Sequence, residues 1–156
     1  MLTPIPKSGA RPGPGRFVIV ASKYNSRYVD GMLRGARTVL AKAKGVELEV
    51  IRVPGAFEIP VVAATLAARG ERRPSAVICL GVILRGETTH AQFIGESVST
   101  ALAQVQIIYH VPVIHEVLLL ENEDQAKVRC LSRDHNRGAE AALTALEMAR
   151  ILRRMA

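Results

Sequence analysis

A polar turn that follows a buried strand and ends at a histidine is the stretch of this 156-residue sequence best suited to chemistry. Residues Ala76 to Leu84 form an almost uninterrupted apolar run, which favours a strand covered on both faces of a parallel sheet. Arg85 to Thr89 then form a polar turn, and apolar positions recur at helical spacing after His90. Free N–H groups and the positive dipole end of a new helix favour a phosphate group. His90 would lie beside that group as a residue able to transfer protons near neutral pH.

The same pattern also has a purely structural interpretation. Thr88 or Thr89 can simply cap the following helix, and His90 can be an ordinary surface histidine. Because strand, turn and helix start occur in every α/β protein, this segment alone does not decide between the two interpretations.

The octapeptide VPGAFEIP at 53–60 is the second segment with functional potential. A proline–glycine pair breaks the chain, and Pro60 suits the first turn of a new helix. The turn amides and the Glu58 carboxylate could hold the hydroxyl groups of a ligand. Equally, Phe57 could plug the core beneath an ordinary strand-to-helix turn.

The elements that must position these segments alternate between strands and helices. We expect strands at 17–21, 47–53, 76–84 and 111–120, and helices at 26–43, 60–69 and 89–109, from 122 onward, and over the last amphipathic stretch after 138. This order predicts a flavodoxin-like three-layer α/β sandwich, a four-stranded parallel sheet flanked by helices. Ligands in such folds bind outside the carboxyl ends of the strands. That rule collects on one rim Tyr24, Asn25, Phe57, Glu58, residues 85–90 and His115.

The composition is that of one globular domain, with 49% apolar residues. Prolines and glycines crowd residues 1–15, so we expect an extended N-terminal arm there and a single α/β domain over 16–156. No apolar run approaches the ~20 residues of a membrane span, and no apolar signal core is visible. The expectation is therefore a cytoplasmic protein without a membrane partner.

The net charge of +7 raises the question of a nucleic-acid partner. The arginines are scattered, aromatic residues make up only 4%, and no nucleic-acid-binding signature accompanies the charge, so we expect no such partner. Cys79 and Cys130 lack a CxxC spacing, which indicates reduced side chains and no metal site.

Four segments together resemble one enzyme family. VPGAFEIP, LGVILRGETTH, VPVI and HNRGAEAALTALEMARIL are similar, in order and spacing, to 6,7-dimethyl-8-ribityllumazine synthases, over Phe17 to Leu152. The resemblance implies the penultimate step of riboflavin biosynthesis, a condensation of 5-amino-6-(D-ribitylamino)uracil with 3,4-dihydroxy-2-butanone 4-phosphate. Phosphate and water are released, without a metal or an organic cofactor. It also implies self-assembly into pentamers, extended in some cases to decamers or 60-mers, with active sites between neighbouring subunits.

The resemblance assigns roles residue by residue. His90 matches the proton-transfer histidine, residues 86–89 the phosphate loop, and Tyr24 the aromatic ring that stacks on the pyrimidine. Arg129 matches an arginine that reaches the phosphate from the adjacent subunit, and Arg137 a lysine near the pyrimidine. The implied substrate-binding residues are Tyr24, Asn25, Ala56, Phe57, Glu58, Ile83, Leu84, Gly86, Glu87, Thr88, Thr89, His115, Arg129 and Arg137.

Three positions depart from the family pattern. His115 stands where phenylalanine is common, and a structural strand-end histidine paired with Glu116 is the alternative to a ligand contact. Glu87 places a carboxylate in a phosphate loop, where it would repel phosphate unless it points outward. The bend SRDHNRG at 132–138 replaces a glycine- and lysine-rich one. The departures at His115 and Glu87 keep open a protein that binds or stores lumazine or flavin without turnover. A third hypothesis is a structural cage or carrier whose assembly is its function, or a nucleic-acid binder that uses the +7 charge.

Overall fold

The sheet of this protein consists of four parallel strands in the order β2-β1-β3-β4. They are β1 (Gly15–Ser22), β2 (Val46–Val53), β3 (Ala76–Leu84) and β4 (Val113–Leu120) in the computed structural model, which describes residues 15–156. The predicted N-terminal arm lies outside the described residues except for Gly15, which opens β1. The central strands β1 and β3 are buried almost throughout, whereas charged residues alternate along the edge strand β2, as the sequence predicts.

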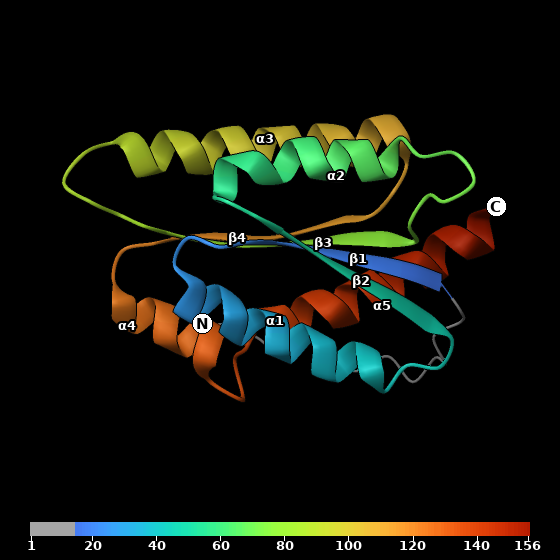
Figure 1. Cartoon of the computed structure of the whole chain (residues 1–156), viewed down its shortest axis with the longest axis horizontal. Helices are drawn as coiled ribbons and strands as arrows, with labels where there is room; N and C mark the ends of the chain where they lie inside the picture. The colour runs from blue at the N-terminus through green and yellow to red at the C-terminus, as the bar shows by residue number, and fades with distance from the viewer. Residues whose placement is uncertain (1–14) are drawn as a thin grey trace.

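Two helical layers cover the sheet (Figure 1). On one face lie α2 (Ile59–Ala67) and α3 (His90–Tyr109), and on the other α1 (Ser26–Ala41), α4 (Glu123–Ala126) and α5 (Arg137–Met155). A 3₁₀ turn, η1 (Ala56–Glu58), precedes α2, and a π-helix, η2 (Lys127–Leu131), continues α4. The predicted three-layer α/β sandwich is therefore confirmed. The first helix ends at Ala41, earlier than expected, and Gly45 supplies a left-handed turn into β2.

Alternating side chains of β1 divide the core into two halves. Phe17, Ile19 and Ala21 pack toward α1 and α5, whereas Val18 and Val20 pack toward α2. Burying each large apolar side chain contributes roughly 1.5–3 kcal/mol to stability. The two halves of the core therefore hold the central strands firmly between the helical layers.

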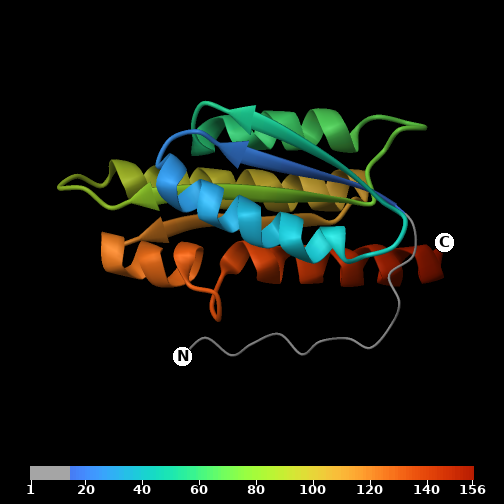
Figure 2. The ribbon, with the colours of Figure 1, turned by 60° about the horizontal axis from the view of Figure 1, so that its bottom comes forward.

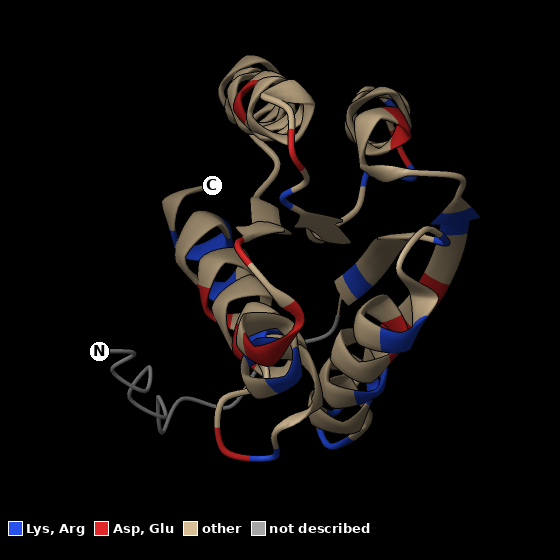
Figure 3. Cartoon of the chain, turned by 90° about the vertical axis from the view of Figure 1, so that its left-hand side faces the viewer, with Lys and Arg blue, Asp and Glu red and all other residues tan. Residues whose placement is uncertain are grey.

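The carboxyl ends of all four strands point to the same end of the molecule (Figure 2). Figure 3 views the chain from that end. Most of the arginine and lysine residues in the helices belong to α1 and α5, whereas α2 contains no charged residue and α3 only Glu96. The layer of α1, α4 and α5 therefore carries a net positive charge, and the layer of α2 and α3 is nearly neutral. No helix among residues 15–156 is long and apolar enough to cross a membrane.

Close backbone packing joins α1 to the start of α5. A Cβ atom on Gly138 would lie 1.9 Å from the Met32 carbonyl oxygen, so only glycine fits there. The Asn136 side chain accepts a hydrogen bond from Ala139 N and donates to the carbonyl oxygens of Gly31 and Cys130. One asparagine therefore caps α5 and ties it to α1 and to η2.

Candidate active site

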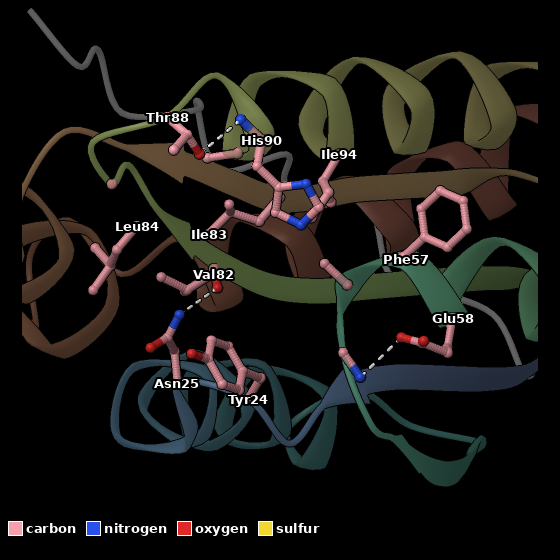
Figure 4. Close-up of a pocket in the computed structure, with 14 residues that line it drawn as sticks. Tyr24, Asn25, Phe57, Glu58, Val82, Ile83, Leu84, Thr88, His90 and Ile94 are labelled. Carbon is pink, nitrogen blue, oxygen red and sulfur yellow. Dashed lines mark hydrogen bonds between the residues drawn. The ribbon is translucent and has the colours of Figure 1, made fainter.

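A cavity of about 590 Å³ opens beyond the carboxyl ends of β1 and β3 (Figure 4). In this strand order the polypeptide leaves β1 toward one side of the sheet and β3 toward the other. Doubly wound folds bind ligands in the crevice beyond the carboxyl ends of two such strands. Three predicted segments meet there: the turn after β1, η1, and the turn from β3 into α3. The cavity is lined by Tyr24, Asn25, Gly55, Ala56, Phe57, Glu58, Val82, Ile83, Leu84, Gly86, Thr88, His90, Ala91 and Ile94.

The turn after β1 presents Tyr24, whose side chain is 74% exposed. Its backbone is fixed because Tyr24 N donates to the Pro54 carbonyl oxygen at 3.0 Å. Asn25 adopts a left-handed conformation at the start of α1. Asparagine is a residue type that often caps helices, but this side chain makes no capping hydrogen bond. Instead its Nδ2 donates to the Val82 carbonyl oxygen at 2.8 Å, joining this turn to the end of β3 (Figure 4).

The η1 turn places Phe57 and Glu58 beside the cavity. Phe57 is 64% exposed, so the interpretation of this ring as a core plug is wrong. Ile59, two residues later, is fully buried and fills that role. One carboxylate oxygen of Glu58 accepts a hydrogen bond from Gly55 N at 3.1 Å, which stabilises the turn and orients the side chain.

The turn from β3 to α3 brings Gly86, Thr88 and His90 to the cavity wall. The His90 ring projects from the first residue of α3 toward the cavity, across from Tyr24 (Figure 4). Thr88 Oγ1 accepts a hydrogen bond from His90 N at 3.3 Å, so Thr88 is the residue that caps locally, while Thr89 makes no capping bond. Glu87 and Thr89 are exposed and lie outside the cavity lining, so the Glu87 carboxylate does not face into the cavity.

None of the residues lining this cavity is lysine or arginine. Arg85, at the start of the turn, is held outside by Glu121 and Gln92 at 2.9 and 2.8 Å. An anion in the cavity of one chain would therefore meet peptide N–H groups, hydroxyls and His90 without a strong fixed positive charge.

The prediction that His115 lies on the same rim is wrong. It is the third residue of β4 and pairs in register with Cys79 in the middle of β3, well before the strand ends. Its Nε2 lies 2.7 Å from Ser99 Oγ, and its Nδ1 accepts a hydrogen bond from Val117 N at 3.1 Å. Pairing with Glu116 is also wrong, because successive side chains of a strand point to opposite faces.

Arg129 and Arg137 also lie away from the cavity, on the α1 and α5 side of the sheet. Arg129 belongs to η2, and the hydrogen bond found for its side chain runs to the Gln125 carbonyl oxygen at 3.4 Å. Arg137, the first residue of α5, binds two carboxylates, Glu116 at 3.1 Å and Glu140 at 2.8 Å. Burial raises the pKa of Glu116 despite the opposing effect of Arg137.

Four residues of the cavity wall are not predicted by the sequence: Gly55, Val82, Ala91 and Ile94. Ile94 follows His90 by one helical turn, so helical spacing is the signal that would have found it. Within residues 15–156, no group of three or more histidine, cysteine or acidic side chains is placed to hold a metal ion. Both cysteines are buried, and burial raises the pKa of the Cys130 thiol to about 12, which keeps it protonated.

Comparison with known proteins gives the family. The family model described as 6,7-dimethyl-8-ribityllumazine synthase matches residues 14–153. A 6,7-dimethyl-8-ribityllumazine synthase of Stenotrophomonas maltophilia (strain R551-3) is 40% identical over 147 residues, covering 92% of this chain and 93% of the relative. One from Xylella fastidiosa (strain 9a5c) is 40% identical over 147 residues, covering 93% and 94%. The family predicted from four sequence segments is confirmed: this chain belongs to the 6,7-dimethyl-8-ribityllumazine synthase family.

Proposed function

We propose that this protein catalyses the condensation of 5-amino-6-(D-ribitylamino)uracil with 3,4-dihydroxy-2-butanone 4-phosphate. The products are 6,7-dimethyl-8-ribityllumazine, phosphate and water. The observation that carries the proposal is the cavity at the ends of β1 and β3, where the family's motif residues Tyr24, Phe57 and His90 converge from three separate turns.

The cavity suits two ligands of different character. The exposed Tyr24 ring offers a flat surface on which a pyrimidine can stack, and the β3 end offers backbone groups at its edge. Glu58 and the η1 turn offer hydrogen-bond acceptors and donors to a polyhydroxylated chain. The turn at 86–89 precedes the start of α3, whose free N–H groups favour the phosphate of the second substrate.

His90 is the residue of the cavity able to move the protons that the reaction requires. The amine of the pyrimidine attacks the ketone, and a first water leaves as the imine forms. The imine then loses phosphate by elimination, and the second nitrogen closes the ring with loss of a second water. Each step transfers a proton near neutral pH, a task suited to imidazole. Holding two reactive substrates side by side supplies the remainder of the rate enhancement.

The missing positive charge supports a site shared between chains. Phosphate departure needs a fixed cation, and the cavity lining contains no lysine or arginine. We propose that Arg129 of a neighbouring copy supplies that cation, since its own chain pairs it with no carboxylate among the described contacts. A head-to-tail contact of this kind is heterologous and closes into a ring, which we take to be a pentamer.

The experiment is to mix the purified protein with both substrates and follow lumazine fluorescence. Fluorescence that rises well above the uncatalysed background supports the proposed enzyme. Tight binding of lumazine without turnover would support the alternative of a binding protein. Salt-sensitive binding of nucleic acid without lumazine formation would instead support a structural or nucleic-acid-binding role.

A further inference from the structure

A chain of side-chain hydrogen bonds runs along the outside of the turn at 86–89. Arg85 Nε donates to Glu121 Oε1 at 2.9 Å, just after the end of β4. Arg85 Nη2 donates to Gln92 Oε1 at 2.8 Å, in the first turn of α3. Gln92 Nε2 in turn donates to Glu96 Oε1 at 2.6 Å, one helical turn later. Four residues thus connect β3, β4 and α3 in one network.

This network closes the turn on the side away from the cavity. The backbone of Arg85 is anchored by its N–H, which donates to the Leu120 carbonyl oxygen at 2.8 Å. Its side chain then reaches across to Gln92, so the segment between them is held at both ends. That segment contains Gly86, Thr88 and His90, which line the cavity, whereas Arg85 and Gln92 do not.

The Gln92 amide can serve this purpose in one orientation only. Its oxygen must accept from the guanidinium of Arg85, which has donors alone, and its NH₂ group must donate to the Glu96 carboxylate, which has acceptors alone. Glu96 therefore fixes the amide, and the amide fixes the guanidinium. A planar guanidinium satisfies Glu121 and Gln92 at once, which the single ammonium of lysine cannot do with the same geometry.

We propose that Arg85 is a positioning residue, which holds the turn at 86–89 and the start of α3 in the shape that receives the phosphate group of the substrate. The inference rests on the function proposed above and adds a role for Arg85, Gln92 and Glu121. The opposite arrangement would have Arg85 swing into the cavity and bind the phosphate directly. The two arrangements predict opposite consequences when the partners of Arg85 are removed.

The test compares Gln92→Met, Arg85→Lys and Arg85→Met with the wild-type protein. For each, the KM values of the two substrates and the inhibition constant of inorganic phosphate are measured. We expect all three substitutions to raise the inhibition constant of inorganic phosphate and the KM of the butanone phosphate about five- to tenfold. The reason is that each disrupts the network of hydrogen bonds that joins Arg85 to Gln92 and Glu121. The KM of the uracil should change by less than about twofold. Arg150→Gln, which breaks an ion pair with Glu147 on α5, is the matched control and should leave all constants unchanged.

Gln92→Met decides between the positioning role and direct phosphate binding by Arg85. It stays informative even if the Arg85 variants fold poorly. If Arg85 binds phosphate directly, freeing it from Gln92 tightens phosphate binding and Arg85→Lys retains most of it. Unchanged or tighter phosphate binding by Gln92→Met therefore overturns the positioning role while lumazine formation by the wild type still supports the proposed function. A wild-type protein that makes no lumazine overturns both.

Discussion

The cavity and a second region divide between them the residues that one family pattern treats as a single site. We call the second region the edge; it comprises the edge strand β4 together with Arg129 of η2 and Arg137 of α5. Tyr24, Phe57 and His90 line the cavity, whereas Arg129 and Arg137 lie on the other side of the sheet. The cavity supplies aromatic surface, hydroxyls and an imidazole, and the edge supplies strong cations. Neither region of one chain is chemically complete. If Arg129 of a neighbouring copy completes the cavity, as we propose, the difference teaches that a sequence motif can identify the parts of a site without showing that they belong to the same subunit.

The two edge arginines also differ from each other. Arg137 lies between the carboxylates of Glu116 and Glu140, so its positive charge is neutralised within its own chain. Arg129 binds only a backbone carbonyl oxygen among the contacts found, so its charge remains available. Arg129 is therefore better suited to bind a doubly charged phosphate, and Arg137 is better suited to bind a neutral carbonyl group.

Arg129→Ala should have the largest effect, because it removes the cation that we assign to the substrate phosphate. We expect the KM of the butanone phosphate to rise on the order of 100-fold, the effect of losing charge-assisted hydrogen bonds. The KM of the uracil should change little, since that substrate carries no phosphate. Steady-state kinetics with each substrate varied in turn measures both. Arg154→Ala, at the exposed end of α5, is the control. Equal effects on both substrates would point to a damaged interface instead.

His90→Ala should have the next largest effect. We expect turnover to fall by about tenfold and by no more than about 100-fold, because the substrates react with each other unaided and a general acid–base residue supplies only part of the rate. The measurement is kcat as a function of pH. A variant with unchanged turnover at every pH would remove His90 from the mechanism.

Mixing the two variants tests the division between cavity and edge directly. When His90→Ala and Arg129→Ala chains are refolded together, random assembly around a heterologous ring leaves roughly a quarter of the shared sites with both residues intact. Partial recovery of activity is therefore expected. If both variants are impaired and mixed rings recover nothing, the shared site is wrong. Light scattering on the same samples shows whether rings or larger shells form.

The sequence predicts the cavity side of this comparison better than the edge. Apolar runs and turn residues locate β3 and α3 almost to the residue, because buried strands and amphipathic helices follow simple periodicities. The rim placement of His115 does not follow even from the expected strand, because His115 is the fifth of the ten residues at 111–120. The structure starts β4 at Val113 and pairs His115 with Cys79, well before the carboxyl end.

Side-chain partners were the other part that the sequence could not supply. Asn25 suits a helix cap by type, yet its amide finds the Val82 carbonyl oxygen, a partner 57 residues away. Glu116 and Arg137 are likewise separated by 21 residues and meet only because α5 packs on β4. Local patterns predict elements, whereas these contacts depend on how the elements pack.

Glu116→Gln tests how the carboxyl group that pairs with Arg137 at the edge affects stability. Burial, helped by the charge of Glu140, raises the pKa of Glu116 in the folded state, and Arg137 only partly opposes it. The folded protein therefore holds this proton more tightly than the unfolded chain does. The stability that the group contributes is complete at low pH and is lost as pH rises through the raised pKa.

The glutamine variant lacks this titration but keeps a hydrogen-bond acceptor for Arg137. We expect the wild-type Tm, relative to that of Glu116→Gln, to fall as the pH rises above the ordinary carboxyl pKa of about 4.5. Thermal unfolding of both proteins as a function of pH is the measurement. Glu71→Gln, at an exposed position, is the control. A wild-type Tm that rises relative to that of Glu116→Gln as the pH increases would contradict the assignment.

His115→Asn should have the smallest effect and separates the edge histidine from the cavity histidine. Because Nδ1 accepts the Val117 N–H, the ring proton lies on Nε2, which donates to Ser99 Oγ, and that hydroxyl donates to the Gly95 carbonyl oxygen. A second proton would have to enter between Nδ1 and the Val117 N–H. Partial shielding of the ring from solvent also lowers the pKa of His115, although the residue as a whole is exposed. A histidine with a lowered pKa contributes stability above its unfolded pKa of about 6.5, and that stability is lost as pH falls through this value.

We therefore expect the Tm of the wild type to fall more than that of His115→Asn between about pH 8 and 5.5, with His135→Asn as the exposed control. Equal losses of Tm would show that the hydrogen bonds of His115 do not restrain its protonation.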